Sequence, residues 1–245
     1  MLFPYSKNRY TISFIKNIEI ESNFRYERKF TATAHHRSEI LQVIKAHPAF
    51  FREIYHPRQV NNIYLDTAKM AFFEANRIGV SERKKVRIRW YGDLLGAIQK
   101  PTLEFKIKHG LVGDKWSWKL ADFALNTDFT FHYLKDVYRQ SNLPDPVREE
   151  LTTIRPTLLN YYQRTYFLSA DGKYRLTLDE QLGYHKIGSN SNTFLHKKVT
   201  PNQFIIELKY GLDIDNHVET ISSKFPFRLD KSSKYVNGIE FLGKY

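Results

Sequence analysis

The stretch Lys85-Val86-Arg87-Ile88-Arg89-Trp90-Tyr91 decides the fold of this chain. Three cations alternate with large apolar or aromatic side chains, and alternation with a period of two is the signature of a β-strand whose two faces differ. The stretch therefore predicts a strand with one apolar face and one face made of Lys and Arg.

The same alternation recurs along the 245 residues and indicates an antiparallel sheet. Clear strand patterns cover 102–108, 173–179 and 203–210, and weaker ones cover 25–31, 60–65, 113–119, 161–168 and 193–199. Helices are expected at 37–46, 128–140, 145–151, 214–224 and from about 232 to 242, with Asp145 as an N-cap before Pro146. The predicted fold class is α+β, and strands of this number and length need closure or cover to avoid open edges.

The polar faces of these strands are mainly Lys and Arg with an occasional carboxylate. For one strand alone, a charged face turned to water is the simpler explanation. Taken together, the aromatic faces of Trp90, Phe105, Tyr174 and Phe204 could pack under helices on the outside, and the charged faces would then line a closed barrel. Enclosed cations repel one another and lose hydration unless an anion neutralises them. This interpretation predicts a phosphate-binding tunnel, because Arg offers forked donors and Lys a compact charge.

Composition narrows the classes of partner. The chain has 38 Lys and Arg against 26 Asp and Glu, which leaves a net charge of +12 and points to nucleic acid, an anionic membrane surface or a phosphate-rich ligand. Nucleic acid is disfavoured, because the basic and aromatic residues alternate on opposite faces instead of sharing one. The absence of cysteine excludes disulfides and thiolate metal sites.

The sequence has neither an apolar run long enough to span a membrane nor a signal-peptide core near its start. A cytoplasmic location is the default expectation, a membrane partner is left open, and the oligomeric state is not indicated. An apolar fraction of 42% is enough for a real core, and no linker-like stretch divides the chain. We expect one domain over 25–245, preceded by an extension over 1–24 whose role the sequence does not indicate.

Five short segments carry a resemblance to a known family. They are RYERKF (25–30), VNNIYLDT (60–67), KVRIRWYG (85–92), LEFK (103–106) and KSSKY (231–235). Together they resemble the VTC domain, the catalytic domain of the vacuolar transporter chaperone polyphosphate polymerase. That domain is a triphosphate tunnel metalloenzyme of the CYTH-like superfamily.

The resemblance implies an antiparallel β-tunnel that transfers the terminal phosphate of ATP to a growing polyphosphate chain and uses Mn²⁺ or Mg²⁺. The residues it implies for catalysis are Lys29, Arg87, Arg89 and Lys106. Those it implies for substrate binding are Lys115, Tyr162, Arg164, Arg175, Lys231, Ser233 and Lys234, and Glu207 is the implied metal ligand.

Plainer roles for several of these residues stay open from the sequence. Glu207 could be a structural ion-pair partner, and Tyr162 could be a core aromatic. Lys231 and Lys234, three apart at the start of the last predicted helix, would share a face, yet could be ordinary surface lysines.

The reaction class also stays open. The wider superfamily begins with Glu-x-Glu-x-Lys, but Arg25 stands here in place of the first Glu. The tunnel would hold few carboxylates, which are Glu27, Glu104, Asp179 and Glu207. Such a tunnel suits the holding of a growing anion better than the activation of water, so transfer is favoured over hydrolysis. The alternatives are a triphosphate hydrolase on the same fold and a polyphosphate-binding module without catalysis.

Overall fold

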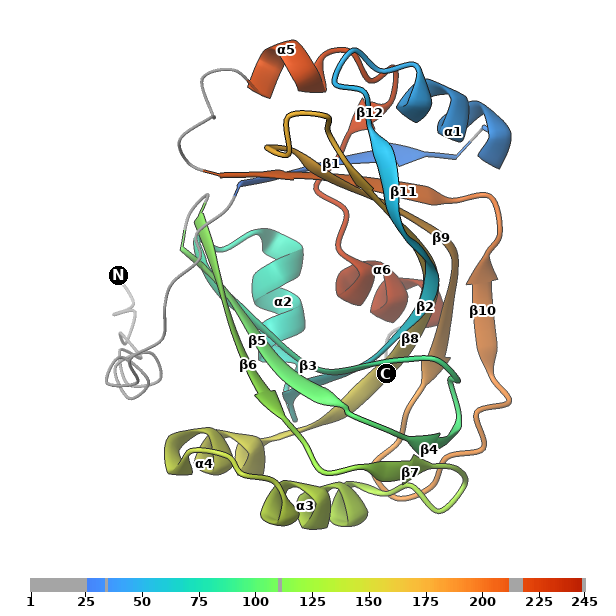
Figure 1. Cartoon of the computed structure of the whole chain (residues 1–245). Helices are drawn as coiled ribbons and strands as arrows, with labels where there is room; N and C mark the ends of the chain where they lie inside the picture. Colours follow the sequence, from blue (N-terminus) through green and yellow to red (C-terminus); the bar gives the residue numbers. More distant parts are fainter. Residues whose placement is uncertain (1–25, 34, 110–111, 212–217, 244–245) are drawn as a thin grey trace, which may run out of the picture.

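The alternating strands pair into one strongly curved antiparallel sheet (Figure 1). The computed structural model describes residues 26–33, 35–109, 112–211 and 218–243, so the extension predicted over 1–24 lies outside the described residues. The strand order is β12-β1-β11-β9-β8-β2-β3-β5-β6, and β10 pairs with β9. These strands are β1 (Tyr26–Ala32), β2 (Arg52–Thr67), β3 (Glu82–Tyr91), β5 (Thr102–His109), β6 (Val112–Lys119), β8 (Ile154–Leu168), β9 (Arg175–Lys186), β10 (Lys197–Thr200), β11 (Phe204–Tyr210) and β12 (Arg228–Leu229). A separate pair is formed by β4 (Gly96–Ile98) and β7 (Phe123–Leu125).

The helices agree with the sequence prediction in most positions but not at all boundaries. They are α1 (Arg37–Lys45), α2 (Ala71–Ile78), α3 (Phe131–Gln140), α4 (Asp145–Thr153), α5 (Val218–Ser222) and α6 (Lys234–Leu242). Helix α2 was not predicted. The expected N-cap at Asp145 is wrong, because the carbonyl of Pro144 already accepts the amides of Val147 and Arg148. The first part of the helix expected over 214–224 lies outside the described residues, and the strand expected over 193–199 begins only at Lys197.

The convex face of the sheet carries the apolar residues, as the alternation predicts. Val86, Ile88, Trp90 and Phe105 pack with residues of α3 and α4 in one buried cluster. A second cluster joins residues of β1, β9 and β11 to α1 and to the segment around α5. Each cluster removes one half of the convex face from water, and apolar burial of this kind drives folding. The side chains of the opposite, concave face are left to line the interior.

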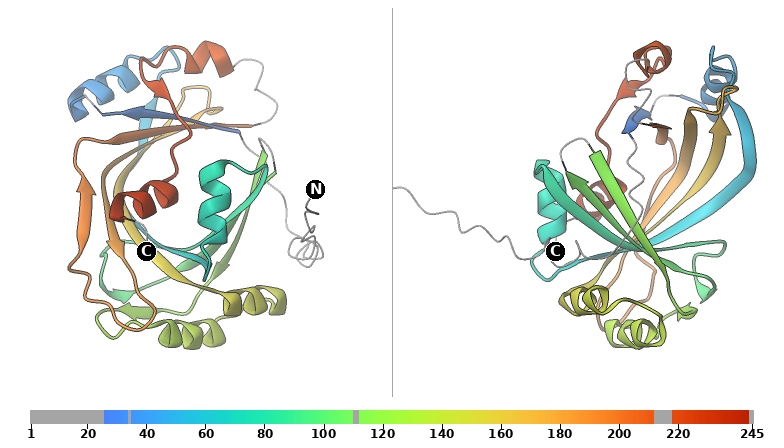
Figure 2. Two further views of the ribbon diagram at one scale, coloured as in Figure 1. Left: turned by 180° about the vertical axis from the view of Figure 1, so that it is seen from behind. Right: turned by 60° about the vertical axis from the view of Figure 1, so that its left-hand side comes forward.

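Two helices depart from the expectation that all helices pack outside the sheet. Helices α2 and α6 lie within its curve, as the views in Figures 1 and 2 agree. The reason is a patch of apolar residues on the concave face: Tyr235 of α6 stacks on Tyr64 at 4.8 Å and also packs with Phe73 of α2. Gly238 lets α6 lie close to β8 and β9, because a Cβ there would lie 2.5 Å from Tyr184 and 2.6 Å from Leu158.

A buried carboxylate joins these two helices. Asp66, at the end of β2, accepts the backbone amides of Thr67, Phe72 and Phe73 and the Tyr235 hydroxyl at 2.6 Å. It thereby satisfies amides at the start of α2 that have no partner within the helix. Asp66, near the end of the segment VNNIYLDT (60–67), thus holds α2 and α6 together.

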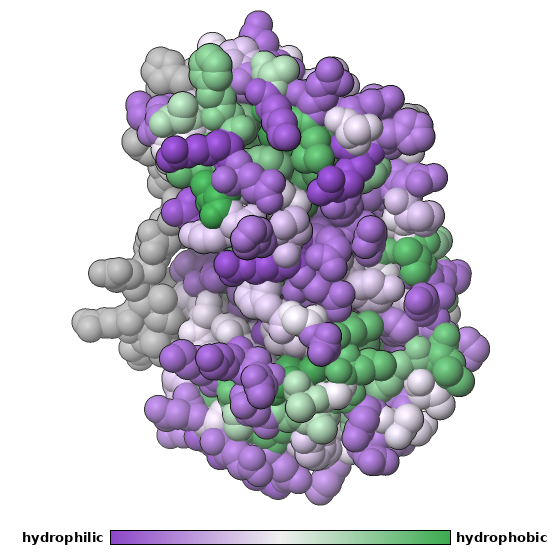
Figure 3. All heavy atoms as spheres, turned by 45° about the vertical axis from the view of Figure 1, so that its right-hand side comes forward, coloured by the Kyte–Doolittle hydropathy of each residue, from purple (hydrophilic) through white to green (hydrophobic). Residues whose placement is uncertain are grey.

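The surface is mainly polar, as a net charge of +12 leads one to expect. Hydrophilic side chains cover most of the face drawn in Figure 3, with apolar ones in smaller groups between them. Within the described ranges, no helix is both long enough and apolar enough to cross a membrane.

Candidate active site: a cation-lined concave face

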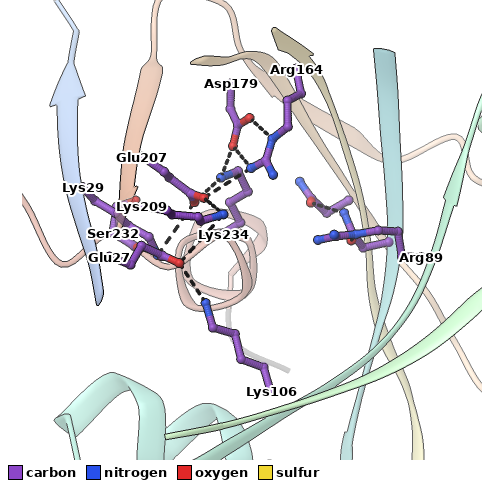
Figure 4. Close-up of polar contacts among 12 residues, drawn as sticks. Glu27, Lys29, Arg89, Lys106, Arg164, Asp179, Glu207, Lys209, Ser232 and Lys234 are labelled. Carbon is purple, nitrogen blue, oxygen red and sulfur yellow. Dashed lines mark hydrogen bonds and ion pairs between the residues drawn. The ribbon is translucent and has the colours of Figure 1, made fainter. Parts of the chain in front are cut away.

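The concave face brings together basic side chains from strands that are far apart in the sequence. Strands β1, β3, β5, β8 and β11 and the first turn of α6 all contribute (Figure 4). The basic residues are Lys29, Lys85, Arg87, Arg89, Lys106, Arg164, Lys209 and Lys234, and the carboxylates among them are Glu27, Glu104, Asp179 and Glu207. Eight cations against four carboxylates leave an excess of four positive charges.

The first group of charges is centred on Asp179, whose side chain is fully buried. Arg164 donates to it through two nitrogens, at 2.5 and 2.6 Å, in a forked arrangement. The Lys234 ammonium lies 2.5 Å from its second oxygen. Burial alone would raise the pKa of Asp179, but Arg164 and then Lys234 outweigh it and hold this pKa below its ordinary value. Asp179 is therefore a permanent anion that fixes two cations in place.

Glu207 extends this group toward β1. Its two oxygens lie 3.1 Å from Lys209, 3.4 Å from Arg164 and Lys234, and 3.9 Å from Lys29. Burial raises the pKa of Glu207, yet the cations, led by Lys234, bring it well below its usual range. As the sequence allowed, Glu207 is an ion-pair partner of several tunnel cations. A metal ion at Glu207 would compete with these cations for the same two oxygens.

The second group lies on β3 and β5 around Glu104. Arg87 donates to Glu104 at 2.6 to 2.8 Å, and the carboxylate also lies 3.5 Å from Arg89 and 3.4 Å from Lys115. Register pairs Arg87 directly with Glu104, so the contact follows from the strand alignment. Arg89 donates in addition to the Asn62 side chain at 3.2 Å. Glu104 thus orients two arginines whose remaining N–H groups can bind an anion.

A third group lies between β1 and β5, each of which is next to an end strand of the sheet. Lys106 of β5 lies 3.1 Å from Glu27 of β1, although these strands are not neighbours in the sheet order (Figure 4). Glu27 also contacts Lys29 at 2.9 Å. Glu27 raises the pKa of Lys106, but burial and the neighbouring lysines outweigh it and lower that pKa to about 8. The side chains of β1 and β5 therefore bring so many cations together that the protonated form of Lys106 is destabilised.

Lys85 shows the same crowding more strongly. It is paired in register with Lys106, and the described contacts include neither a hydrogen bond nor an ion pair for its ammonium. Burial, then Lys29 and Lys106, lower the pKa of Lys85 well below its ordinary value. An ammonium that is desolvated and surrounded by cations gains much from a bound anion.

Tyr162 and Ser233 have structural roles beside any role in binding. Tyr162 is buried, and the charged ends of Arg164 and Lys234 lie 5.1 and 4.8 Å from its ring centre, so the ring supports two cations of the site. The Ser233 hydroxyl caps α6 by accepting the Val236 amide at 3.4 Å. Both residues therefore position Lys234.

Three of the expected binding residues lie at the edge of the site. Arg175 is on the tunnel-facing side of β9 but at its exposed end, and Lys115 is half-exposed. Lys231 precedes α6, is exposed and does not share a helix face with Lys234. That expectation was wrong because the helix begins at Lys234, after the cap at Ser233.

Sequence reasoning left Lys85 and Lys209 out of the site. The available signal was the alternation itself, since Lys85 shares a strand face with Arg87 and Arg89, and Lys209 shares one with Glu207.

The carboxylates fit a divalent metal only in part. Within the described ranges, His, Asp and Glu do not gather in groups of three or more that could hold a metal. Glu27 and Glu207 do lie on one face of adjacent strands, where they influence each other's pKa. Mg²⁺ is commonly bound by one or two carboxylates together with substrate phosphates, so this pair fits a metal that arrives with its substrate.

Comparison with known proteins places this site in a family. Residues 24–243 match the VTC domain. No curated protein matches the sequence. Among solved structures, a candidate adenylate cyclase from Bacillus halodurans is similar, with a TM-score of 0.50 and 12% identity over 92% of this chain and 100% of that one. HpAC1 from Hippeastrum, a candidate adenylyl cyclase described as having a dominant triphosphatase activity, gives a TM-score of 0.49 and 14% identity over 91% and 99% of the two chains. The likeness to the Bacillus halodurans protein shows that the two chains share a fold.

Proposed function

Because the chain belongs to the VTC domain family, we propose that it is a polyphosphate polymerase that works inside a closed β-tunnel. The reaction is the transfer of the terminal phosphate of ATP to the end of a polyphosphate chain. The observation that carries the proposal is the excess of cations over carboxylates on the concave face, where Lys85 forms no ion pair with any carboxylate that the structure describes. A polyanion is the ligand that would neutralise such a surface.

The state of the carboxylates supports transfer rather than hydrolysis. Each of the four carboxylates of the site already contacts at least two cations, and the pKa of each lies below its ordinary value. A general base works best with a pKa near the operating pH. These carboxylates are too acidic for that task, whereas a phosphate oxygen that attacks as the nucleophile is already anionic and needs no base.

Phosphoryl transfer requires mainly positioning and charge neutralisation. Arg87 and Arg89, oriented by Glu104, would bind the oxygens of the triphosphate. Lys85 and Lys106 would hold the acceptor chain on the same strands. An oxygen of the acceptor's terminal phosphate attacks the γ-phosphorus in line, the bond from that phosphorus to the β–γ bridging oxygen breaks, and ADP leaves with the electron pair.

A Mg²⁺ or Mn²⁺ ion would be held by Glu207 and Glu27 with substrate oxygens. It would supply additional neutralisation of the phosphate charge. The protein side chains keep the task of orientation, with Arg164 and Lys234 fixed by Asp179.

The test is to incubate the purified protein with ATP and Mn²⁺ or Mg²⁺ and to size the products on a polyphosphate gel. We expect a ladder of chains, lost in Arg89→Ala and Glu207→Ala. Arg139→Ala is the matched control, because Arg139 is exposed on α3 and pairs with Asp136 outside the site. Orthophosphate without a ladder would indicate a hydrolase, and tight polyphosphate binding without turnover would indicate a binding module.

A further inference from the structure

A cluster of three tyrosines and one arginine lies beside the cation-lined site and has no part in the reaction described above. The guanidinium carbon of Arg58 lies 5.0 Å from the ring centre of Tyr55, 5.9 Å from that of Tyr166 and 6.0 Å from that of Tyr91. Tyr55 and Tyr166 meet edge to face at 5.8 Å. The four residues come from β2, β3 and β8, so the sheet itself holds them together.

The aromatic rings of this cluster are accessible. Tyr55 and Tyr91 are 53% and 50% exposed, and they lie on the exposed first half of β2 and at the exposed end of β3. Tyr166 is less exposed than these two rings, and burial and then the neighbouring Tyr91 raise its pKa. The cluster therefore offers ring surfaces to the solvent side of the site.

The cluster follows directly after the phosphate-binding arginines. Tyr91 is two residues beyond Arg89 on β3, and Tyr166 is two residues beyond Arg164 on β8, so each lies about 7 Å further along the same strand face. Arg58 is paired in register with Arg164. A triphosphate bound by Arg89 and Arg164 would thus place whatever is attached to its near end over these rings.

Toward the start of β3, the same strand face carries cations instead of aromatic rings. From Tyr91 the same face continues through Arg89, Arg87 and Lys85 to Arg83, which is a row of cations and suits a chain of phosphates. Only one end of this row is aromatic. The row therefore has a polarity that matches a nucleoside triphosphate, with a flat apolar group at one end and anionic groups at the other.

We propose that Tyr55, Arg58, Tyr91 and Tyr166 form a binding site for the base of the donor nucleotide. The inference rests on the proposed function, because it takes a nucleoside triphosphate as the donor. The base stacks on an exposed tyrosine ring, and Arg58 lies near enough to contribute a planar cation. Stacking on a ring face is tolerant of base identity, so the site binds purine nucleotides with similar affinity.

The test compares two ligands by titration calorimetry, inorganic tripolyphosphate and the non-hydrolysable adenosine 5′-(β,γ-imido)triphosphate. In Tyr91→Ala and Tyr55→Ala we expect the affinity for the nucleotide analogue to fall about tenfold each. The affinity for tripolyphosphate should stay within about twofold, because that ligand has no base. Tyr91→Phe keeps the ring and should retain nucleotide affinity. Phe241→Ala is the matched control, because Phe241 is also an exposed ring under a cation, Lys198 at 5.0 Å, but lies on α6.

The outcomes separate this inference from the proposed function. Tripolyphosphate binding by the unmodified protein reports on the phosphate-binding tunnel, whatever the tyrosines do. An equal loss of affinity for both ligands would show that the tyrosines only support the fold, and unchanged nucleotide affinity would show that the base binds elsewhere. Either result overturns the assignment and leaves the tunnel intact.

Discussion

Replacing Asp179 by Asn tests whether its ion pairs with Arg164 and Lys234 stabilise the fold, and whether a bound phosphate can take the place of the lost carboxylate. Asp179 is fully buried and is the closest acceptor of both Arg164 and Lys234. In the variant Glu207, which lies 3.4 Å from each of these two buried cations, would be the only anion that they share among the described contacts. Loss of one partner from a buried ion pair generally costs 3–5 kcal/mol. Since Glu207 remains, we expect the lower end, about 3 kcal/mol, or a melting temperature lower by about 6–12 °C for a chain of this size.

The assay is urea denaturation of the unmodified protein and of Asp179→Asn, each with and without tripolyphosphate. A ligand at about 100 times its Kd stabilises the native state by about 2.7 kcal/mol, and the variant should gain at least this much because a phosphate replaces the missing anion. The difference between the two proteins should also shrink as the pH falls below about 4. The pKa of Asp179 is lowered by folding, so its contribution is present above the unfolded pKa and is lost as the pH falls through the folded one.

The matched control is Asp136→Asn on α3, where Asp136 forms an exposed pair with Arg139 at 2.6 Å. Exposed pairs contribute about 1 kcal/mol or less. If Asp179→Asn costs no more than this control, the buried group is not a structural unit and the reasoning is refuted.

Three further predictions concern binding and packing. Tripolyphosphate affinity should fall between pH 7 and pH 9 as Lys106, whose pKa is about 8, loses its proton. Because Lys106 is partly exposed and screened, we expect about three- to fivefold rather than tenfold, and Lys106→Arg should flatten the titration profile. Gly183→Ala should lower the free energy of unfolding by about 1–3 kcal/mol, since its Cβ would lie 2.2 Å from the Tyr161 ring; a smaller change in urea denaturation would mean that the ring moves freely. Asp66→Asn should cost about 2 kcal/mol, because an amide nitrogen would face one of the backbone N–H donors of α2, and an unchanged stability would show that water replaces the carboxylate.

The faces of the strands were predictable because period-two alternation is a local property of the sequence. Lys85 to Tyr91 alternates as β3 does in the structure, and the convex packing of Trp90 follows from it. The pairs that the site depends on are not local. Arg164 meets Glu207, and Lys234 meets Asp179, through the curvature of the whole sheet, and nothing in the sequence near any of them specifies these contacts.

The missed helix and the misplaced helix start have physical reasons. Helix α2 follows Met70, whose backbone is left-handed. Its first amides donate to Asp66, several residues upstream, and no side chain at the N-cap position accepts them. The usual capping pattern is therefore absent from the sequence. At α6 two serines compete for the cap, and only the structure shows that Ser233 takes it while the Ser232 carbonyl accepts from Lys29 at 3.1 Å. Because Ser232 and Ser233 have the same side chain, the sequence pattern alone does not indicate which of them caps α6.

The contact between Lys106 and Glu27 has a consequence for the mechanics of the sheet. Most of the wall is joined by ladders of backbone hydrogen bonds, whereas β5 and β1 meet here through two flexible side chains at 3.1 Å. Such a pair weakens as ionic strength rises. Because β1 and β5 are not neighbours in the sheet order, salt or a competing polyanion can separate these two side chains without breaking a backbone hydrogen bond. A polymer much longer than the protein would then enter between β1 and β5 at its middle and would not have to be threaded from one end.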